Sequence, residues 1–143
     1  MNKYVHIYSS EFGVTALSIH SNSLGQTCEN DHLRLCKQEL KDYFNGETFE
    51  FTCKLDLEGT DFQKKVWKEL KRIPYGKSYS YKDVALKVGG ANYARAVGMA
   101  NNKNPVPILI PCHRVIGKSG DLTGFGGGLS NKEILLNLEQ SSF

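Results

Sequence analysis

The sequence has 143 residues, of which 40% are hydrophobic and 10% aromatic, and its net charge is +3. A chain of this length forms one compact core, with room for a small additional lobe. No apolar run approaches the roughly 20 residues that cross a membrane, and no signal-peptide pattern is present. These features exclude a membrane protein and lead us to expect a cytoplasmic one.

The net charge conceals an asymmetry between the two parts of the chain. Residues 1–57 carry five Lys/Arg and eight Asp/Glu, a net charge of −3, whereas residues 58–143 carry thirteen and seven, a net charge of +6. A basic segment indicates a polyanionic partner, although ordinary variation in surface charge gives similar numbers. We therefore expect a structural N-terminal lobe over 1–57 and a functional domain over 58–143.

The N-terminal segment has the pattern of a small lobe of strands and one helix. Residues 3–9 and 14–20 alternate as two strands, with a turn between them. Asp31 can cap a helix that ends near Phe44. Residues 49–53 alternate like a further strand.

Three residues of this lobe have a spacing that could suit a metal ion. Cys28, His32 and Cys36 recur at every fourth position and would share one face of a helix. No fourth ligand is evident, and Cys28 precedes the expected helix. We therefore interpret the cysteines as buried free thiols and predict no metal.

The next helix is announced by a capping box. Thr60 and Gln63 have the required types and spacing, and the helix that they open ends near Arg72. Its apolar residues fall on one side, which we interpret as packing against the core: Phe62, Val66, Trp67 and Leu70.

The following pair of helices has the spacing of a helix-turn-helix. Ser80 caps a helix that runs to about residue 88, where two glycines end it, and a second helix covers about residues 92–101. Many αα-hairpins have the same pattern. In the second helix, however, alanine and glycine surround Arg95, which favours a face that approaches another surface closely.

A glycine-rich segment over residues 117–128 leads to the last helix, which we expect to run from a capping box at Ser130 to about Glu139. Phe125 lies among the glycines and indicates a wall of a slot for a flat ligand rather than a merely flexible loop. Taken together, the elements predict an α+β fold: a small N-terminal strand/helix lobe followed by a mostly helical C-terminal domain with a helix-turn-helix.

The chemistry of the chain is concentrated in residues 111–117, which read PCHRVIG. Here Cys112 stands beside His113. A thiolate is a strong nucleophile, and a nearby imidazole can make it available at neutral pH. If the segment is extended, the two side chains point to opposite faces, so a direct contact between them is not assured.

The blocks around Cys112 resemble the O6-alkylguanine-DNA alkyltransferases, also called methylated-DNA–protein-cysteine methyltransferases. The resemblance runs from about Thr60 to Glu139, in the order of the family, and the first sixty residues match only loosely. The blocks that carry it are TDFQ (60–63), IPYGKSYSY (73–81), ARAVGMANN (94–102), NPVPILIPCHRVIG (104–117) and GFGGGL (124–129).

This resemblance implies that an alkyl group passes from O6 of guanine to Cys112. O4-alkylthymine is a further candidate substrate. His113 would act as a base through a water molecule, and Glu139 would orient the imidazole. The thioether product is stable to water, so the protein would act once. The chemistry requires no cofactor.

The implied partner is double-stranded DNA containing O6-alkylguanine, bound through the minor groove with little sequence preference. The damaged nucleotide would be flipped out of the stack, and Arg95 would fill the space it leaves. We expect a cytoplasmic monomer, nucleoid-associated or nuclear according to the organism. Further contacts to the substrate and the DNA would come from Tyr81, Asn104, Val115, Phe125, Gly126 and Gly127.

Three other functions share part of this pattern. Non-catalytic lesion-binding relatives replace the cysteine, so the presence of Cys112 argues against that function. A helix-turn-helix regulator needs a larger polar recognition face than a helix with one long polar side chain, Arg95, provides. A Cys-His hydrolase needs an oxyanion hole and a peptide cleft, which the basic C-terminal segment gives no reason to expect.

Overall fold

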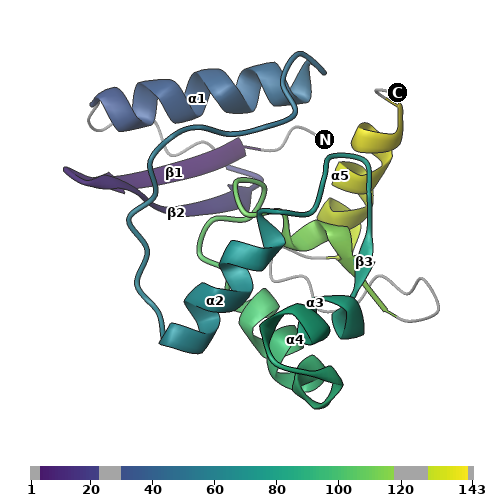
Figure 1. Cartoon of the computed structure of the whole chain (residues 1–143). Coiled ribbons are helices and arrows are strands. Elements are labelled where there is room, and N and C mark those ends of the chain that lie inside the picture. Colours follow the sequence, from purple (N-terminus) through teal and green to yellow (C-terminus); the bar gives the residue numbers. More distant parts are fainter. Residues whose placement is uncertain (1–3, 23–29, 118–128, 142–143) are drawn as a thin grey trace. The chain divides into compact units, whose positions relative to one another are not determined.

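The computed structural model describes residues 4–22, 30–117 and 129–141, and its helices and strands are shown in Figure 1. Contacts between Cα atoms divide the chain into two compact units, Met1–Glu58 and Gly59–Phe143. Both strands and helices are present, so the predicted α+β class is confirmed. Within the described part of the chain, none of the helices has the length and hydropathy needed to cross a lipid bilayer.

The N-terminal unit consists of a hairpin and one helix. Strands β1 (Tyr4–Ser10) and β2 (Gly13–His20) pair antiparallel, and α1 (Asp31–Phe44) packs along them (Figure 1). These elements match the predicted ones. The residue that caps the helix differs from the prediction by one position. The side chain of Asn30, not Asp31, accepts a hydrogen bond from the Leu33 amide.

The strand predicted over residues 49–53 is wrong. This segment has no strand partner, and only Leu55 forms an isolated bridge, to Val14. The reason is that Glu39 of α1 takes the donors that a strand would use. Its carboxylate accepts the backbone N–H groups of Thr52 (2.9 and 3.0 Å) and Cys53 (2.8 Å).

The C-terminal unit is built around three helices that contact one another: α2 (Asp61–Leu70), α3 (Tyr81–Val88) and α4 (Ala94–Asn102). Thr60 and Ser80 cap α2 and α3 through capping boxes, as their spacing requires. Their shared core is made of small and branched apolar side chains. It includes Val66, Leu70, Val84, Ala85, Val88, Val97 and Ala100.

One polar bond fixes α4 within this cluster. The buried indole of Trp67 donates to the carbonyl of Ala100 at 2.9 Å, which satisfies a group that would otherwise be costly to bury. Figure 1 shows α2, α3 and α4 packed together, with a short 3₁₀ turn (Ala91–Tyr93) joining the last two. The predicted helix-turn-helix arrangement is therefore present.

Two further elements complete the unit. Strands β3 (Tyr79–Ser80) and β4 (Val115–Ile116) form a short parallel pair that joins the segment before α3 to the segment after Cys112. The last helix, α5 (Leu129–Ser141), starts one residue before Ser130. The helix therefore begins slightly earlier than predicted, with Ser130 inside its bounds.

Candidate active site

The nucleophile segment is a tight turn rather than an extended strand. Residues Cys112–Arg114 form a 3₁₀ helix, in which the Arg114 amide donates to the carbonyl of Pro111 at 3.0 Å. The Cys112 amide donates to Ile110 at 2.7 Å. The segment is therefore not extended at this point, because these local bonds close the backbone into a turn.

The loop before Cys112 is held by Asn104. Its side-chain amide donates to the carbonyl of Ile110 at 2.9 Å, and its oxygen accepts from the Val106 amide at 3.0 Å. Within the loop, the buried residue Ile108 has a φ of 77°. A β-branched residue rarely adopts this conformation, which costs about 1–2 kcal/mol. The surrounding bonds therefore hold the loop in a strained shape next to the nucleophile.

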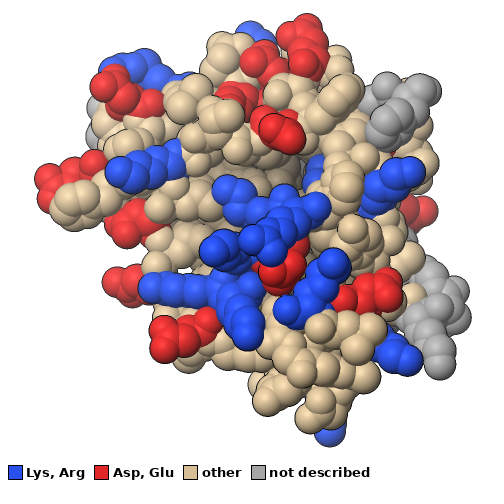
Figure 2. Space-filling view, viewed as in Figure 1, with Lys and Arg blue, Asp and Glu red and all other residues tan. Residues whose placement is uncertain are grey.

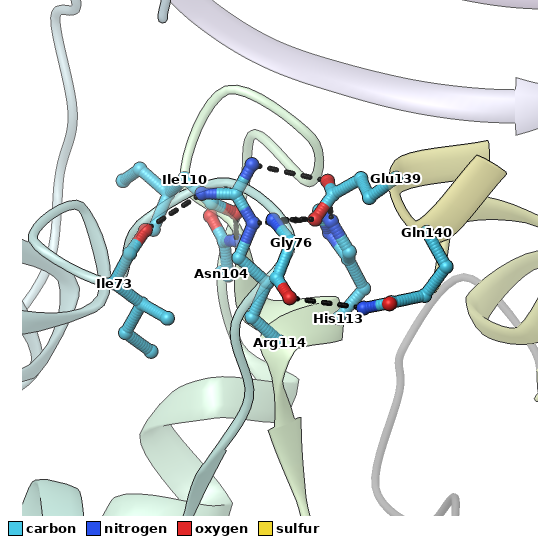
Figure 3. Close-up of polar contacts among 8 residues, drawn as sticks. All are labelled: Ile73, Gly76, Asn104, Ile110, His113, Arg114, Glu139 and Gln140. Carbon is cyan, nitrogen blue, oxygen red and sulfur yellow. Dashed lines mark hydrogen bonds and ion pairs between the residues drawn. The ribbon is translucent and has the colours of Figure 1, made fainter. Parts of the chain in front are cut away.

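A single buried carboxylate organises the other side of the turn. Glu139 of α5 accepts a hydrogen bond from Nε2 of His113 at 2.6 Å. It also accepts from Nε and Nη2 of Arg114, at 2.8 and 3.0 Å, and from the amide of Gly76 at 3.3 Å. Figure 3 shows these groups converging on the carboxylate. Four donors from two segments, the nucleophile turn and the turn after α2, therefore fix one side chain of α5.

Arg114 extends this cluster toward the end of α2. Its Nη1 donates to the carbonyl of Ile73 at 2.7 Å, and its guanidinium lies over the ring of Tyr75, with 5.5 Å to the ring centroid. The neighbouring residue of α5, Gln140, donates to the carbonyl of Gly76 at 2.9 Å. These bonds tie α5 to the turn that follows α2 (Figure 3).

The electrostatics of the cluster assign a charge to each group. Burial alone would raise the pKa of Glu139, but hydrogen bonds and charges from His113 and Arg114 lower it to about 2. Burial, the largest influence, lowers the pKa of His113 together with the charges of Arg114 and Lys132, although Glu139 opposes this. The site at neutral pH thus contains a carboxylate and a neutral imidazole. Because Nε2 donates to Glu139, the unprotonated nitrogen is Nδ1.

Nδ1 of His113 is buried and has no hydrogen-bond partner among the described residues. An unprotonated ring nitrogen held in this way can accept a proton, and the carboxylate on the other side of the ring stabilises the imidazolium that results. The arrangement can therefore perform general base chemistry.

Cys112 itself is only 2% exposed. Burial raises the pKa of its thiol to about 11, although a hydrogen bond from Asn104 and the charge of Lys132 oppose this rise. The resting group at neutral pH is the thiol, and a nucleophilic reaction must remove its proton. This requirement gives the neighbouring base a function.

Lys132 and Arg114 belong to the site but were not among the predicted site residues. Lys132 is fully buried, and its Nζ donates to the carbonyl of Val115 at 2.6 Å. A signal for it exists in the sequence: Lys132 lies three and seven residues before Leu135 and Glu139, so all three share one face of the helix. A lysine on the buried face of a helix must be paired, which marks it as a candidate.

The predicted site residues fall into three groups. Cys112, His113, Glu139, Asn104 and Val115 meet around the nucleophile turn. Tyr81 begins α3 and is half-buried near Gly98 of α4, where a built Cβ would lie 3.8 Å from its ring, while Arg95 is exposed on α4. Phe125, Gly126 and Gly127 lie outside the described residues.

The predicted cysteines of the N-terminal lobe divide in the same way. Cys36 and Cys53 are buried free thiols, and a hydrogen bond with Cys53 together with burial raises the pKa of Cys36. Cys28 lies outside the described residues. Among those that are described, no group of three or more His, Cys, Asp or Glu side chains could hold a metal ion.

The fold and site define a protein with a nucleophilic cysteine attached to a helix-turn-helix, since Asn101 of α4 donates to the carbonyl of Cys112 at 3.4 Å. Comparison with family models is consistent with this class. Residues 4–57 match the 6-O-methylguanine DNA methyltransferase ribonuclease-like domain, and residues 61–141 match the DNA binding domain of the same family. The chain therefore belongs to the 6-O-methylguanine DNA methyltransferase family, which confirms the family that the sequence resembles.

Individual relatives show the extent of the match. The chain is 56% identical to the methylated-DNA–protein-cysteine methyltransferase of Mycobacterium bovis over 103 residues, which are 72% of this chain and 62% of that protein. It is 52% identical to the protein of that name from Methanosarcina barkeri over 109 residues, 76% of this chain and 69% of the relative. The match thus spans less than two thirds of the mycobacterial protein.

A solved structure extends the comparison to the fold. The crystal structure of Mycobacterium tuberculosis OGT in complex with DNA has a TM-score of 0.84 to this chain at 44% sequence identity. The match covers 96% of this chain and 87% of the mycobacterial one. Both units of the chain thus have counterparts in that fold.

Proposed function

We propose that the protein repairs DNA by transferring the alkyl group of O6-alkylguanine to Cys112. The observation that carries this proposal is the buried set of Cys112, His113 and Glu139, which is joined to the helix-turn-helix by the bond from Asn101 to Cys112. In this set the imidazole is neutral, its Nε2 donates to Glu139, and Nδ1 is left as the acceptor. Membership of the family and the DNA-bound relative support the same reaction.

In the proposed step, the proton of the Cys112 thiol passes to Nδ1 of His113 through one water molecule. The buried polar nitrogen needs a hydrogen-bond partner, and a water can provide one. The Sγ–C bond forms as the bond between the alkyl carbon and O6 breaks, and its electron pair goes to O6. The guanine anion then takes up a proton from the Tyr81 hydroxyl. Tyr81 regains a proton from solvent, and the His113 imidazolium returns its proton to solvent, so both residues end in their starting forms. The products are a thioether and an unmodified guanine, so each molecule acts once.

Lys132 supports the same step by its charge. Its ammonium group is buried, is held at the Val115 carbonyl, and attracts a thiolate on Cys112. A positive charge near the developing thiolate makes loss of the proton easier. We assign it the role of an electrostatic partner and not of a proton acceptor.

We infer that the substrate is double-stranded DNA with little sequence preference, approached by α4 through the minor groove. The exposed face of α4 carries Arg95, Met99 and Asn102, which are four and three residues apart. Arg95 is the side chain long enough to enter the stack when the nucleotide is flipped out. This mode needs one copy of the protein and places it with chromosomal DNA, in the cytoplasm of a bacterium or archaeon.

The deciding experiment is an intact mass measurement after incubation with a duplex containing one O6-methylguanine. We expect a gain of one methylene group, located by peptide mapping to Cys112. Peptides with Cys36 and Cys53 serve as internal controls and should be unchanged, as should Cys112→Ala and wild-type protein given an undamaged duplex.

The other outcomes are also informative. Binding to the lesion without a mass gain would favour a non-catalytic lesion-binding protein instead. If the protein neither binds the lesion nor takes up the alkyl group, the proposed function is contradicted altogether. Conversion of many substrate molecules by each protein molecule, with no cysteine modified, would indicate a hydrolase.

A further inference from the structure

The exposed side of α2 and the turn after it carries a dense group of basic residues that the proposed chemistry does not use. Residues 61–72 contain five Lys/Arg and two Asp/Glu, so their net charge of +3 equals that of the whole chain. Figure 2 shows Lys and Arg side chains gathered over α2. We call the five exposed residues the basic face: Lys64, Lys65, Lys68, Lys71 and Arg72.

The spacing of the basic face places it on one side of the helix. Within α2, Lys64, Lys65 and Lys68 (i, i+1 and i+4) fall within an arc of about 100° at 3.6 residues per turn, and Lys71 and Arg72 follow in the turn after the helix. The opposite side is buried and contains Val66, Trp67 and Leu70. The buried side faces α4, because Trp67 bonds to Ala100, so the basic face is on the part of α2 that α4 leaves exposed, and Arg95 is on a different helix.

Acidic neighbours leave most of this charge uncompensated. Glu69 pairs with Arg72 at 2.8 Å, and Asp61 lies in the first turn of the helix. Among the described residues, none of the four lysines forms an ion pair. Like charges at this spacing repel one another, so the face gains most from a partner with regularly spaced negative charges.

We propose that the basic face binds the phosphate backbone of a second segment of double-stranded DNA, while α4 holds the segment that is searched for damage. This inference rests on the proposed function, because it takes DNA to be the ligand of α4. Lysines are compact charges that contact phosphates without reading bases, so the second contact is independent of sequence. A protein that holds two segments can transfer between them without dissociating into solution.

Bridging of two duplexes tests the proposal. A lesion-free duplex is attached to beads, and retention of a fluorescent lesion-free duplex is measured with and without the protein. Wild-type protein should retain the fluorescent duplex. The variant Lys64→Gln/Lys65→Gln/Lys68→Gln should retain it at least about tenfold less, because three phosphate contacts are lost.

Matched variants separate this effect from net charge and from folding. Lys37→Gln/Lys41→Gln/Lys54→Gln removes the same charge from exposed positions of the N-terminal unit and should bridge like wild type. Replacing Lys64, Lys65 and Lys68 by Arg should retain bridging. All variants should repair a short duplex containing O6-methylguanine at close to the wild-type rate.

The proposal is overturned if the Gln variant of the basic face bridges as well as wild type, or if wild-type protein does not bridge at all. Loss of bridging in the N-terminal control as well would also overturn it, because net charge would then explain the effect. Failure of the wild-type protein to repair the short duplex would instead contradict the proposed function, and the two failures are therefore distinguishable.

Discussion

Glu139 shows how much of the site depends on one side chain. Its carboxylate holds the imidazole of His113 and the guanidinium of Arg114, and it accepts the amide of Gly76. The sequence alone could not pair Glu139 with His113, because 26 residues separate them and no local spacing joins them. The family resemblance supplied that pairing. Arg114 was missed because nothing in its neighbourhood along the chain shows that it is buried.

Replacing Glu139 by Gln should slow alkyl transfer by about 100- to 10,000-fold, the usual contribution of general base catalysis. The amide can still accept a hydrogen bond from His113, but it has no charge to stabilise the imidazolium. Because the variant also leaves Arg114 without its ionic partner, single-turnover rates on an O6-methylguanine duplex are compared at a temperature at which urea unfolding shows both proteins to be folded. Binding of the same duplex should then change little. Glu133→Gln, on the exposed face of α5, is the matched control. A Glu139→Gln rate equal to that of Glu133→Gln would refute the assigned role.

The same carboxylate should make folding sensitive to acid. The pKa of Glu139 is lowered to about 2 from an ordinary 4.5, so the ionised form stabilises the folded protein. This contribution, about 3 kcal/mol, is complete above the unfolded pKa and is lost as the pH falls toward 2. Urea unfolding between about pH 5 and pH 3 should show a steeper loss of stability in wild type than in Glu139→Gln. Parallel curves would show that Glu139 does not titrate as described.

At the scale of elements, the helices were predictable and the strands of the C-terminal unit were not. Thr60 and Ser80 announce α2 and α3 because a capping box is a local pattern. The β3–β4 pair joins two-residue strands whose partners, Tyr79 and Val115, are far apart in sequence and carry no shared pattern. The mistaken strand over residues 49–53 has a similar cause, since alternation cannot reveal a competing acceptor such as Glu39.

The exposure of Arg95 on α4 allows its function to be separated from folding. Arg95→Ala should change the free energy of unfolding by no more than about 0.5 kcal/mol, because the side chain is exposed. Repair of an O6-methylguanine duplex should slow by about 10- to 100-fold, because flipping of the nucleotide loses its support. Reaction with free O6-benzylguanine, which needs no flipping, should be unaffected. Equal effects on both substrates would mean that Arg95 acts on the chemistry; Arg34→Ala provides a control for removal of an exposed arginine.

At the scale of the whole molecule, charge is divided between the two units. The unit Met1–Glu58 contains five Lys/Arg and nine Asp/Glu, a net charge of −4, and the unit Gly59–Phe143 contains thirteen and six, a net charge of +7. The sequence shows this division of charge. It does not show on which surface the basic side chains lie, because that depends on the folded structure. The helix with the densest positive charge, α2, is not the one that carries Arg95.

Because the C-terminal unit is positively charged, affinity for a lesion-containing duplex should fall steeply as the salt concentration rises. A plot of the logarithm of the binding constant against the logarithm of salt concentration should be linear, with a slope of about −0.9 for each phosphate contact. Fluorescence anisotropy between about 50 and 200 mM salt measures the slope. Exchange of three exposed lysines in the N-terminal unit for Gln should leave it unchanged. Binding that does not respond to salt would exclude a backbone-dominated interface.

The residues around the nucleophile differ in how many side-chain bonds they make, and this difference has an evolutionary consequence. Removing Glu139 or Arg114 leaves buried charges without partners and endangers the fold. Cys112 is small, and its backbone rather than its thiol closes the turn. Drift toward a protein that binds lesions without repairing them should therefore begin at residue 112, with the surrounding charged residues preserved. Mutational libraries selected for folding alone should reproduce this order, tolerating substitutions at 112 well before those at 114 or 139.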